Sequence, residues 1–223
     1  MTTIPKMLVS GLGLLVLLGL LLFLPAGTLN YWQAWVLVIL AISTRIFSAY
    51  LLRVNPAVLQ RRMRGGPKAE TRAAQKVAMA GLWLSLAAMF VVSALDHRFG
   101  WSPVPTAISL VGDVLVAVGL GLAMLVVLQN SHAAATVQVE SGQKVVSTGL
   151  YGLVRHPMYA GNLIMMVGIP LALGSYWGLV FVIPGLVGLA FRIRDEEKLL
   201  TEDLDGYREY TQEVRYRLVP GMW

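Results

Sequence analysis

The chain has 223 residues and a net charge of +6, with 57% apolar residues, only 13% charged residues and a mean hydropathy of +0.67. A soluble domain averages about 45–50% apolar and about 25% charged residues, so a water-soluble fold of this size could not bury so much apolar surface. The composition predicts an all-α integral membrane protein and excludes a soluble enzyme, a DNA-binding domain and a disordered tail.

Four apolar runs, each long enough to cross a bilayer as a helix, make up the first part of the chain. They cover residues 7–24, 31–52, 77–95 and 106–128. No convincing cleavage site follows the first run, so we interpret it as a span; a signal-anchor is the alternative. Arg45 in the second run and Asp113 in the fourth are intramembrane charges. We expect them to form a structural pair, with a transport path as the alternative.

The connection 53–76 between the second and third spans carries seven Lys and Arg residues and one acid, Glu70. By the positive-inside rule this loop is cytoplasmic, and so are the N-terminus and the segment after the fourth span. Residues 1–191 hold 12 basic residues against 4 acidic ones, whereas the tail from Arg192 holds 6 against 8. The basic charge therefore orients the protein in anionic lipid and does not indicate nucleic-acid binding.

The next apolar run, 159–191, has 33 residues without a charge. A straight helix of that length would be about 50 Å long, against about 30 Å of hydrocarbon. Arg155 precedes the run and Arg192 follows it, so both ends are basic. We predict a helical hairpin that enters and leaves on the cytoplasmic side and turns near Gly174-Ser175; a single kinked span is the alternative. In the tail, Tyr207, Tyr210 and Val214 are spaced as on one face of an amphipathic helix.

The hairpin would bring two polar segments together at the membrane surface. In the first, Pro157 suits the first turn of a helix, so His156 lies at that helix's N-terminus, which favours anions. In the second, Arg192 and Glu196 are four residues apart, a pairing that suits a zwitterionic ligand. Ordinary explanations exist for both segments: an interfacial belt for the first and a surface i,i+4 ion pair for the second.

Three stretches carry a specific resemblance: VVSTGLYGLVRHPMYAGN, RIRDEEKLL and GYREYTQEVRYRLVPGMW. Together with the uncharged hairpin between the first two, they resemble the isoprenylcysteine carboxyl methyltransferase family, which has prokaryotic members and is related to the phospholipid N-methyltransferases. The resemblance covers roughly residues 136–223. The hydropathy pattern predicts one membrane domain, 1–223, with a four-span part, 1–128, and a second part, 129–223. The resemblance implies that the second part binds S-adenosylmethionine without a Rossmann domain. No strand–GxGxG–helix pattern is present, and Gly119-Leu120-Gly121 is interpreted as small-residue helix packing.

The resemblance also implies which residues bind the cofactor at the cytoplasmic face. They are Lys144, Val145, Val146, Tyr151, His156, Pro157, Met158 and Tyr159, with Glu196 or Glu197. Arg192 would face the substrate and hold its carboxylate. Two positions depart from the family pattern. Gln143 stands where eukaryotic members have histidine, and Leu204-Asp205-Gly206-Tyr207 stands where many members read phenylalanine-glycine.

The resemblance implies S-adenosylmethionine-dependent methylation of a lipophilic small molecule or lipid, with a carboxylate as the expected acceptor. An amine acceptor would need a base, for which Glu197 or His156 is the candidate. An NADPH-dependent reductase of the sterol-reductase type and a non-enzymatic adaptor or transporter are the alternatives. No metal is expected, because the chain has no cysteine and its three histidines are scattered.

Overall fold

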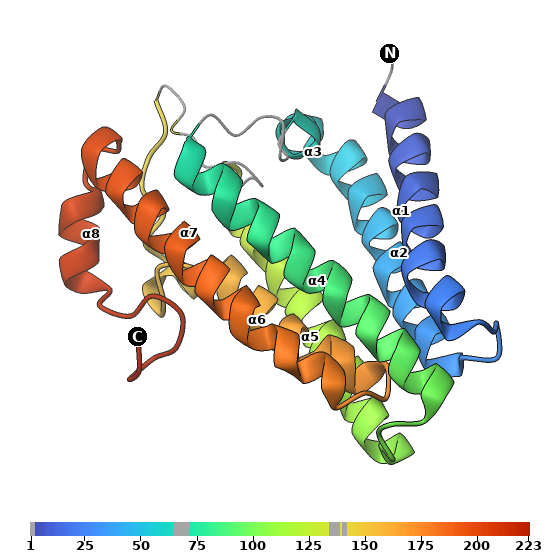
Figure 1. The fold of residues 1–223 in the computed structure, drawn as a ribbon. Coiled ribbons are helices and arrows are strands. Elements are labelled where there is room, and N and C mark those ends of the chain that lie inside the picture. The colour runs from blue at the N-terminus through green and yellow to red at the C-terminus, as the bar shows by residue number, and fades with distance from the viewer. Residues whose placement is uncertain (1–2, 65–71, 134–138, 140–141) are drawn as a thin grey trace.

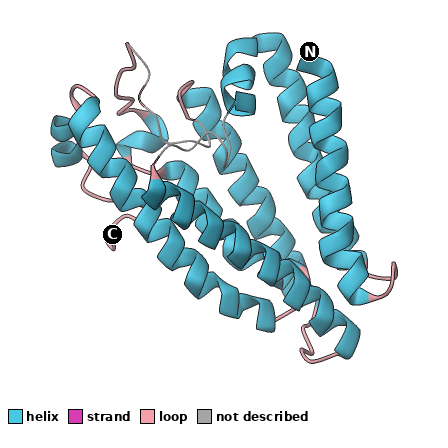
Figure 2. Cartoon of the chain, turned by 45° about the horizontal axis from the view of Figure 1, so that its top comes forward, coloured by secondary structure: helices cyan, strands magenta, loops and turns pink. Residues whose placement is uncertain are grey.

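The structure is a computed structural model that describes residues 3–64, 72–133, 139 and 142–223. Lys68 and Glu70 of the basic connection, and several residues near 136 where the resemblance begins, lie outside the described residues. The described residues form helices and no strand, which confirms the all-α prediction (Figures 1 and 2). The elements are α1 (Thr3–Ala26), α2 (Trp32–Val54), α3 (Pro56–Arg64), α4 (Ala73–Phe99), α5 (Thr106–Gln129), η1 (Gly149–Gly152), α6 (Pro157–Ala172), η2 (Trp177–Phe181), α7 (Val182–Asp203) and α8 (Tyr207–Glu213).

Five helical segments within the described residues are long and apolar enough to cross a membrane. Four of them contain the predicted spans, and the fifth, Trp177–Asp203, is the second arm of the predicted hairpin. The first arm, α6, is shorter, with 16 residues. The chain reverses at Gly174, whose φ of 70° is the left-handed conformation that glycine adopts without strain. The predicted hairpin is therefore confirmed, together with its turn.

The helix α5 packs against α6, so that the predicted fourth span supports the first arm of the hairpin. Gly119 and Gly161 face each other so closely that a Cβ on either glycine would lie within 3 Å of the carbonyl oxygen of the other. Seven residues further along each helix, a Cβ on Gly168 would lie 3.0 Å from the Gly112 carbonyl oxygen, and a Cβ on Gly112 would meet the backbone of Leu171 and Ala172. Gly121, in contrast, has nothing within 4 Å of the place where a Cβ would stand. The interpretation of small residues as packing residues thus holds for Gly119 and not for Gly121.

A polar cluster ties the far end of the hairpin to the preceding helices. The Asp96 carboxylate is buried and accepts hydrogen bonds from the Ser175 hydroxyl, at 2.5 Å, and from the Ser102 hydroxyl, at 2.6 Å. The Tyr31 hydroxyl donates to the Leu173 carbonyl at 2.7 Å, and its ring stacks on that of His97. Both sides of the hairpin turn are therefore fixed to the loops before α2 and after α4.

The predicted pair between Arg45 and Asp113 is wrong. An Arg45 guanidinium nitrogen donates instead to the Ser10 hydroxyl at 3.1 Å, and neither Asp113 oxygen has a hydrogen-bond partner among the described residues. The two charges lie at different depths. Arg45 is 13 residues into α2 and Asp113 is 7 residues into α5. Since both helices begin at the same end of the molecule, these positions differ in depth by about 9 Å at 1.5 Å per residue.

Within the basic connection, α3 forms a short amphipathic helix that the sequence analysis did not separate. Its start has a sequence signal, because Pro56 is the first helical residue and the Asn55 side chain accepts a hydrogen bond from the Val58 N–H at 3.3 Å. Val58 and Leu59 are buried and contact an apolar cluster that includes Met158. The helix is thereby held over the end of the molecule where α6 begins.

Candidate functional site

A polar cavity lies where α6 begins and α7 ends. Segments distant in the sequence line it: the end of α5 and the loop after it, residues 143–146, the stretch from Tyr151 to Tyr159, and the end of α7 with α8. The lining residues are Asn130, His132, Ala133, Gln143, Lys144, Val145, Val146, Tyr151, Arg155, His156, Pro157, Met158, Tyr159, Glu196, Leu200, Leu204, Tyr207 and Tyr210. The cavity therefore combines the two polar segments that the hairpin was expected to bring together.

The C-terminal tail fixes the backbone just before α6. The backbone N–H groups of Arg155 and His156 donate to the carbonyls of Tyr216 and Arg217, both at 2.9 Å. Pro157 is then the first helical residue, where its missing N–H costs nothing. The side chain of His156 is thus positioned by a strand-like pairing with the tail and by the helix that follows.

The side chain of Glu197 contacts Arg155, His156 and Arg217, three residues of the same backbone pairing. Its carboxylate accepts hydrogen bonds from Arg155 Nε at 2.7 Å and from Arg217 Nε at 2.8 Å, and its Oε1 lies 3.3 Å from His156 Nε2. The Arg155 guanidinium also donates to the Val214 carbonyl at 3.1 Å. Glu197 does not line the cavity. Its carboxylate connects the segment before α6, α7 and the tail.

Glu196 points the other way and lines the cavity. Its carboxylate accepts a hydrogen bond from the Tyr159 hydroxyl at 2.6 Å, and that hydroxyl accepts one from Arg192 Nε at 2.8 Å. The Arg192 guanidinium also donates to the Gln75 side-chain oxygen at 2.8 Å. Arg192 is only 3% exposed, and Gln75 is fully buried. A continuous chain of hydrogen bonds therefore runs from the cavity to α4.

This chain of hydrogen bonds is extended by an ion pair. The Gln75 amide donates to Asp195 Oδ2 at 2.8 Å, and Arg72 donates two hydrogen bonds to the same carboxylate, at 2.6 and 2.9 Å. This pairing with Asp195 raises the pKa of Arg72. A two-pronged arginine–carboxylate contact is geometrically specific, so it fixes the start of α4 against α7.

Three tyrosines form the wall of the cavity on the tail side. The Tyr210 hydroxyl donates to the Tyr151 carbonyl at 2.7 Å, and Asn130 donates to the Tyr151 hydroxyl at 3.1 Å. The hydroxyl of Tyr207 is buried and has no partner among the described residues. Burial raises the pKa of Tyr151, Tyr207 and Tyr210, so all three phenols stay neutral at physiological pH. Each offers a hydroxyl and an aromatic face.

An apolar groove of about 350 Å³ adjoins the polar cavity. Helices α4 and α6 form its sides, and α7 and α3 contribute one or two residues each. The lining residues are Arg62, Met79, Leu82, Trp83, Leu86, Met89, Met158, Tyr159, Asn162, Met165, Met166, Ile169, Leu189 and Arg192. Met158 and Tyr159 line both the groove and the cavity, so these two residues are the shared wall between them.

The structure places nine of the ten predicted cofactor residues around the polar cavity. They are Lys144, Val145, Val146, Tyr151, His156, Pro157, Met158, Tyr159 and Glu196, whereas Glu197 lies outside it. Arg192, the predicted substrate residue, lines the apolar groove. The sequence did not predict that Asn130, Tyr207 and Tyr210 line the cavity or that Gln75 is a partner of Arg192. Only the tyrosines had left a signal, through their helical spacing, which was interpreted as packing alone.

The described residues include no group of three or more His, Cys, Asp or Glu side chains that could hold a metal ion. The sets of side chains that do converge are the ion pairs around Glu197 and the aromatic wall of the cavity.

Comparisons with known proteins give matches to part of the chain. The family model described as phospholipid methyltransferase matches residues 107–205, which contain α5, α6 and α7. Over 88 residues the chain is 32% identical to Delta(14)-sterol reductase of Mus musculus. This alignment covers 38% of the chain and 21% of the reductase, so the chain matches about a fifth of that relative's length.

One solved structure also resembles the chain: the eukaryotic intramembrane Ras methyltransferase ICMT, an isoprenylcysteine carboxyl methyltransferase. The alignment has 16% identity and a TM-score of 0.45, and it covers 100% of this chain and 88% of the other. The family match contains the histidine-proline element and the paired glutamates of the motifs. The match to the phospholipid methyltransferase model thus covers the part of the chain that contains the motifs resembling the isoprenylcysteine carboxyl methyltransferases.

Proposed function

We propose that the chain is an S-adenosylmethionine-dependent methyltransferase that methylates the carboxylate of a lipophilic substrate at the cytoplasmic face of the membrane. The observation that carries this proposal is the shared wall of Met158 and Tyr159 between a polar cavity and an apolar groove. A water-soluble cofactor in the cavity and a membrane-soluble substrate in the groove would meet at this wall.

The residues of the polar cavity suit S-adenosylmethionine. Glu196 and the Tyr159 hydroxyl offer partners for the ammonium group or the ribose, and Lys144 offers a cation for the carboxylate. The Tyr207 hydroxyl, buried and without a partner among the described residues, is one donor that a ligand would satisfy. The faces of the tyrosine rings suit both an adenine ring and a sulfonium cation. When bound, this cofactor supplies an electrophilic methyl group.

Arg192 would hold the substrate carboxylate. Its guanidinium is fixed by Tyr159 and Gln75, at the end of the apolar groove where lipid gives way to water. A carboxylate is already ionised at neutral pH, so its methylation needs alignment and desolvation and no general base. Glu197 and His156, the candidate bases for an amine acceptor, contact each other, and Glu197 also accepts hydrogen bonds from Arg155 and Arg217. This arrangement favours a carboxylate acceptor.

The membrane orientation follows from the basic connection. Figure 1 shows α3 and the start of α4 at the end of the molecule where α7 ends. The polar cavity is lined by residues at that end of α7. Positive charge concentrates in cytoplasmic loops, so we place the N-terminus, α3 and the cavity at the cytoplasmic face. The loops around Asp96 and Ser175 would then lie at the opposite face.

The match to the sterol reductase favours one second candidate, a reductase that uses NADPH. The 2′-phosphate of NADPH requires several convergent cations. Among the described lining residues, the arginine or lysine side chains are Lys144 and Arg155, and Arg155 is already paired with Glu197. The cavity therefore favours the methyltransferase.

Calorimetric titration of the detergent-purified protein tests the proposal. S-adenosylhomocysteine should bind and NADPH should not. Glu196→Gln should weaken the binding of S-adenosylhomocysteine at least tenfold, about 1.4 kcal/mol, because it removes a charged partner. Glu202→Gln, an exposed glutamate on the same helix that does not line the cavity, is the matched control and should bind like the parent. Binding of NADPH alone would replace the proposal with the reductase. Binding of neither cofactor would favour a non-enzymatic role.

A further inference from the structure

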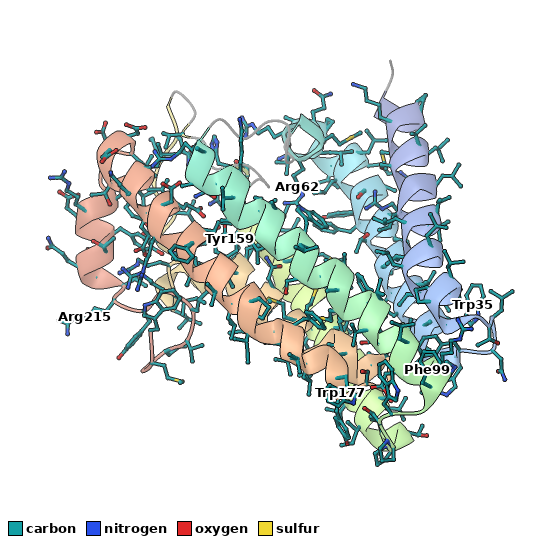
Figure 3. All side chains as sticks on the ribbon, in the orientation of Figure 1. Trp35, Arg62, Phe99, Tyr159, Trp177 and Arg215 are labelled. Atoms are coloured by element: carbon teal, nitrogen blue, oxygen red, sulfur yellow. The ribbon has the colours of Figure 1, made fainter. Side chains whose placement is uncertain are left out.

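Arg62 is a partly buried cation at the apolar groove. It comes from α3, as Figure 3 shows, and it lines the groove together with Arg192 of α7. One of its guanidinium nitrogens donates to the Ala133 carbonyl at 3.1 Å. No described carboxylate pairs with it, and burial lowers its pKa. Part of the basic connection thus has a place in the interior and a role beyond orienting the protein in the membrane.

Within the described residues, the surroundings of Arg62 supply no opposite charge for its partly buried guanidinium. Taking a charge out of water is costly unless an opposite charge or several hydrogen bonds replace the water. The described residues that line the groove include two arginines and no aspartate or glutamate. This composition is complementary to an anion that lies among otherwise apolar surroundings.

The other residues that line the groove indicate which kind of anion would fit it. Five of the lining residues are methionines, whose flexible thioethers adapt to an apolar chain. The volume of about 350 Å³ is near the lower end of the about 300–1,000 Å³ typical of ligand pockets, so it suits one hydrocarbon chain and not two. Trp83 lines the groove and remains half exposed, which leaves a side open toward the bilayer.

We propose that Arg62 is a second substrate-binding cation of the apolar groove, which holds the carboxylate of a single-chain lipid together with Arg192. This proposal rests on the proposed function and adds a residue to its substrate site. In the reaction a carboxylate oxygen forms a bond to the methyl carbon of S-adenosylmethionine. The carbon–sulfur bond breaks with its electron pair left on sulfur, and no proton moves. Arg62 and Arg192 orient the carboxylate while the chain lies between α4 and α6.

The test uses radiolabelled palmitate as the probe and the full chain in detergent. Arg62→Gln should raise the dissociation constant of palmitate at least tenfold, and Arg62→Lys should recover part of the loss because it keeps the charge. The dissociation constant of S-adenosylhomocysteine should change less than twofold. Arg53→Gln is the matched control, since it removes one positive charge from the same connection at an exposed position outside the groove. It should bind palmitate like the parent.

Thermal unfolding without ligand separates binding from folding. Removal of a partly buried cation that pairs with no carboxylate among the described residues should leave the unfolding midpoint of Arg62→Gln equal to that of the parent or raise it. A midpoint lower by several degrees would assign Arg62 to the structure and overturn the proposal. Unchanged palmitate affinity in Arg62→Gln would also overturn it.

Competition with lipids of the same chain length tests the headgroup and the number of chains. Hexadecanol and dipalmitoyl phosphatidic acid should not displace palmitate. Displacement by the alcohol would show that the anion is not recognised, and displacement by the two-chain lipid would refute the single-chain assignment. Failure of the parent to bind S-adenosylhomocysteine would refute the proposed function, whereas the palmitate measurements would still decide the role of Arg62.

Discussion

Glu196 and Glu197 are adjacent on α7, yet their carboxylates contact different partners. Glu196 lines the polar cavity and bonds to Tyr159, whereas Glu197 lies between Arg155, His156 and Arg217. Successive helical residues are about 100° apart around the axis, so the two side chains cannot share one environment. The pair thus divides into a residue that a ligand can reach and a residue that holds the tail.

We therefore expect Glu197→Gln to lower stability. The change leaves two guanidinium groups without their carboxylate, and the loss of a charged hydrogen-bond partner costs about 1–3 kcal/mol. For a chain of this size about 1 kcal/mol corresponds to 2–4 °C in the unfolding midpoint. Thermal unfolding in detergent should show a decrease of several degrees, and Glu196→Gln should show a smaller one. Equal unfolding midpoints for the two variants would contradict the assignment of Glu197 to holding the tail and Glu196 to contacting a ligand.

Substitutions of Arg192 should lower turnover and leave cofactor affinity unchanged. Its guanidinium contacts Tyr159 and Gln75 with two different nitrogens, an arrangement that the single nitrogen of lysine does not reproduce. Arg192→Lys should lower methylation of a lipid carboxylate at least tenfold, and Arg192→Ala should lower it further. Titration with S-adenosylhomocysteine should give affinities within about twofold of the parent. A large loss of cofactor affinity in both variants would instead place Arg192 in the cofactor site.

At the scale of elements, the contact between α5 and α6 depends on missing side chains. A Cβ on Gly112 would clash with the backbone of Ala172, and a Cβ on Gly168 would lie 2.8 Å from Leu115 Cβ. Backbone atoms cannot move aside as the end of a flexible side chain can. The position of α6, which carries Met158 and Tyr159, is therefore set by how closely it approaches α5.

Gly112→Ala should destabilise the protein by about 1–3 kcal/mol, the usual cost of overpacking. Gly121→Ala is the matched control on the same helix, because nothing lies within 4 Å of its added methyl group. It should be neutral or slightly stabilising, since alanine favours the helix more than glycine does. Unfolding midpoints of the two variants in detergent provide the measurement. A neutral Gly112→Ala would show that the two helices can separate without cost.

At the scale of the whole molecule, the hairpin decides which face of the membrane carries the tail. Because α6 and the α7 segment run in opposite directions, the beginning of α6 and the end of α7 lie at the same end of the molecule. The tail then bonds back to Arg155 and His156. The polar cavity depends on this contact between the tail and the start of α6, since α8 supplies part of the cavity wall.

Accessibility of introduced cysteines tests the orientation, since the chain has none of its own. Single cysteines at Gln60, Lys144 and Arg215, all exposed positions, should react with a membrane-impermeant reagent only from the cytoplasmic side. Pro103→Cys, in the exposed loop between α4 and α5, should react only from the opposite side. Reaction of Arg215→Cys from the side of Pro103→Cys would exclude the hairpin topology.

Much of the architecture could be predicted from the sequence because the bilayer imposes a simple rule. A run of apolar residues long enough to cross must be a helix, and a run that is too long must turn where glycine and proline allow it. The spans, the hairpin and its turn at Gly174 follow from this rule. The motif residues from Lys144 to Tyr159 and Glu196 were assigned through resemblance, and they line one cavity in the structure.

Other features depend on tertiary contacts that have no local signal. Arg45 and Asp113 do not pair because they lie at different depths along two different helices. Glu196 lines the cavity and Glu197 does not, because their side chains leave α7 in different directions. Gln75 and Arg62 come from segments that, in sequence, show only polar or basic character. The sequence by itself determined which segments enter the membrane, since hydropathy acts locally. Only the tertiary structure decided which polar side chains meet, because that depends on how helices distant in the sequence are rotated and aligned against each other.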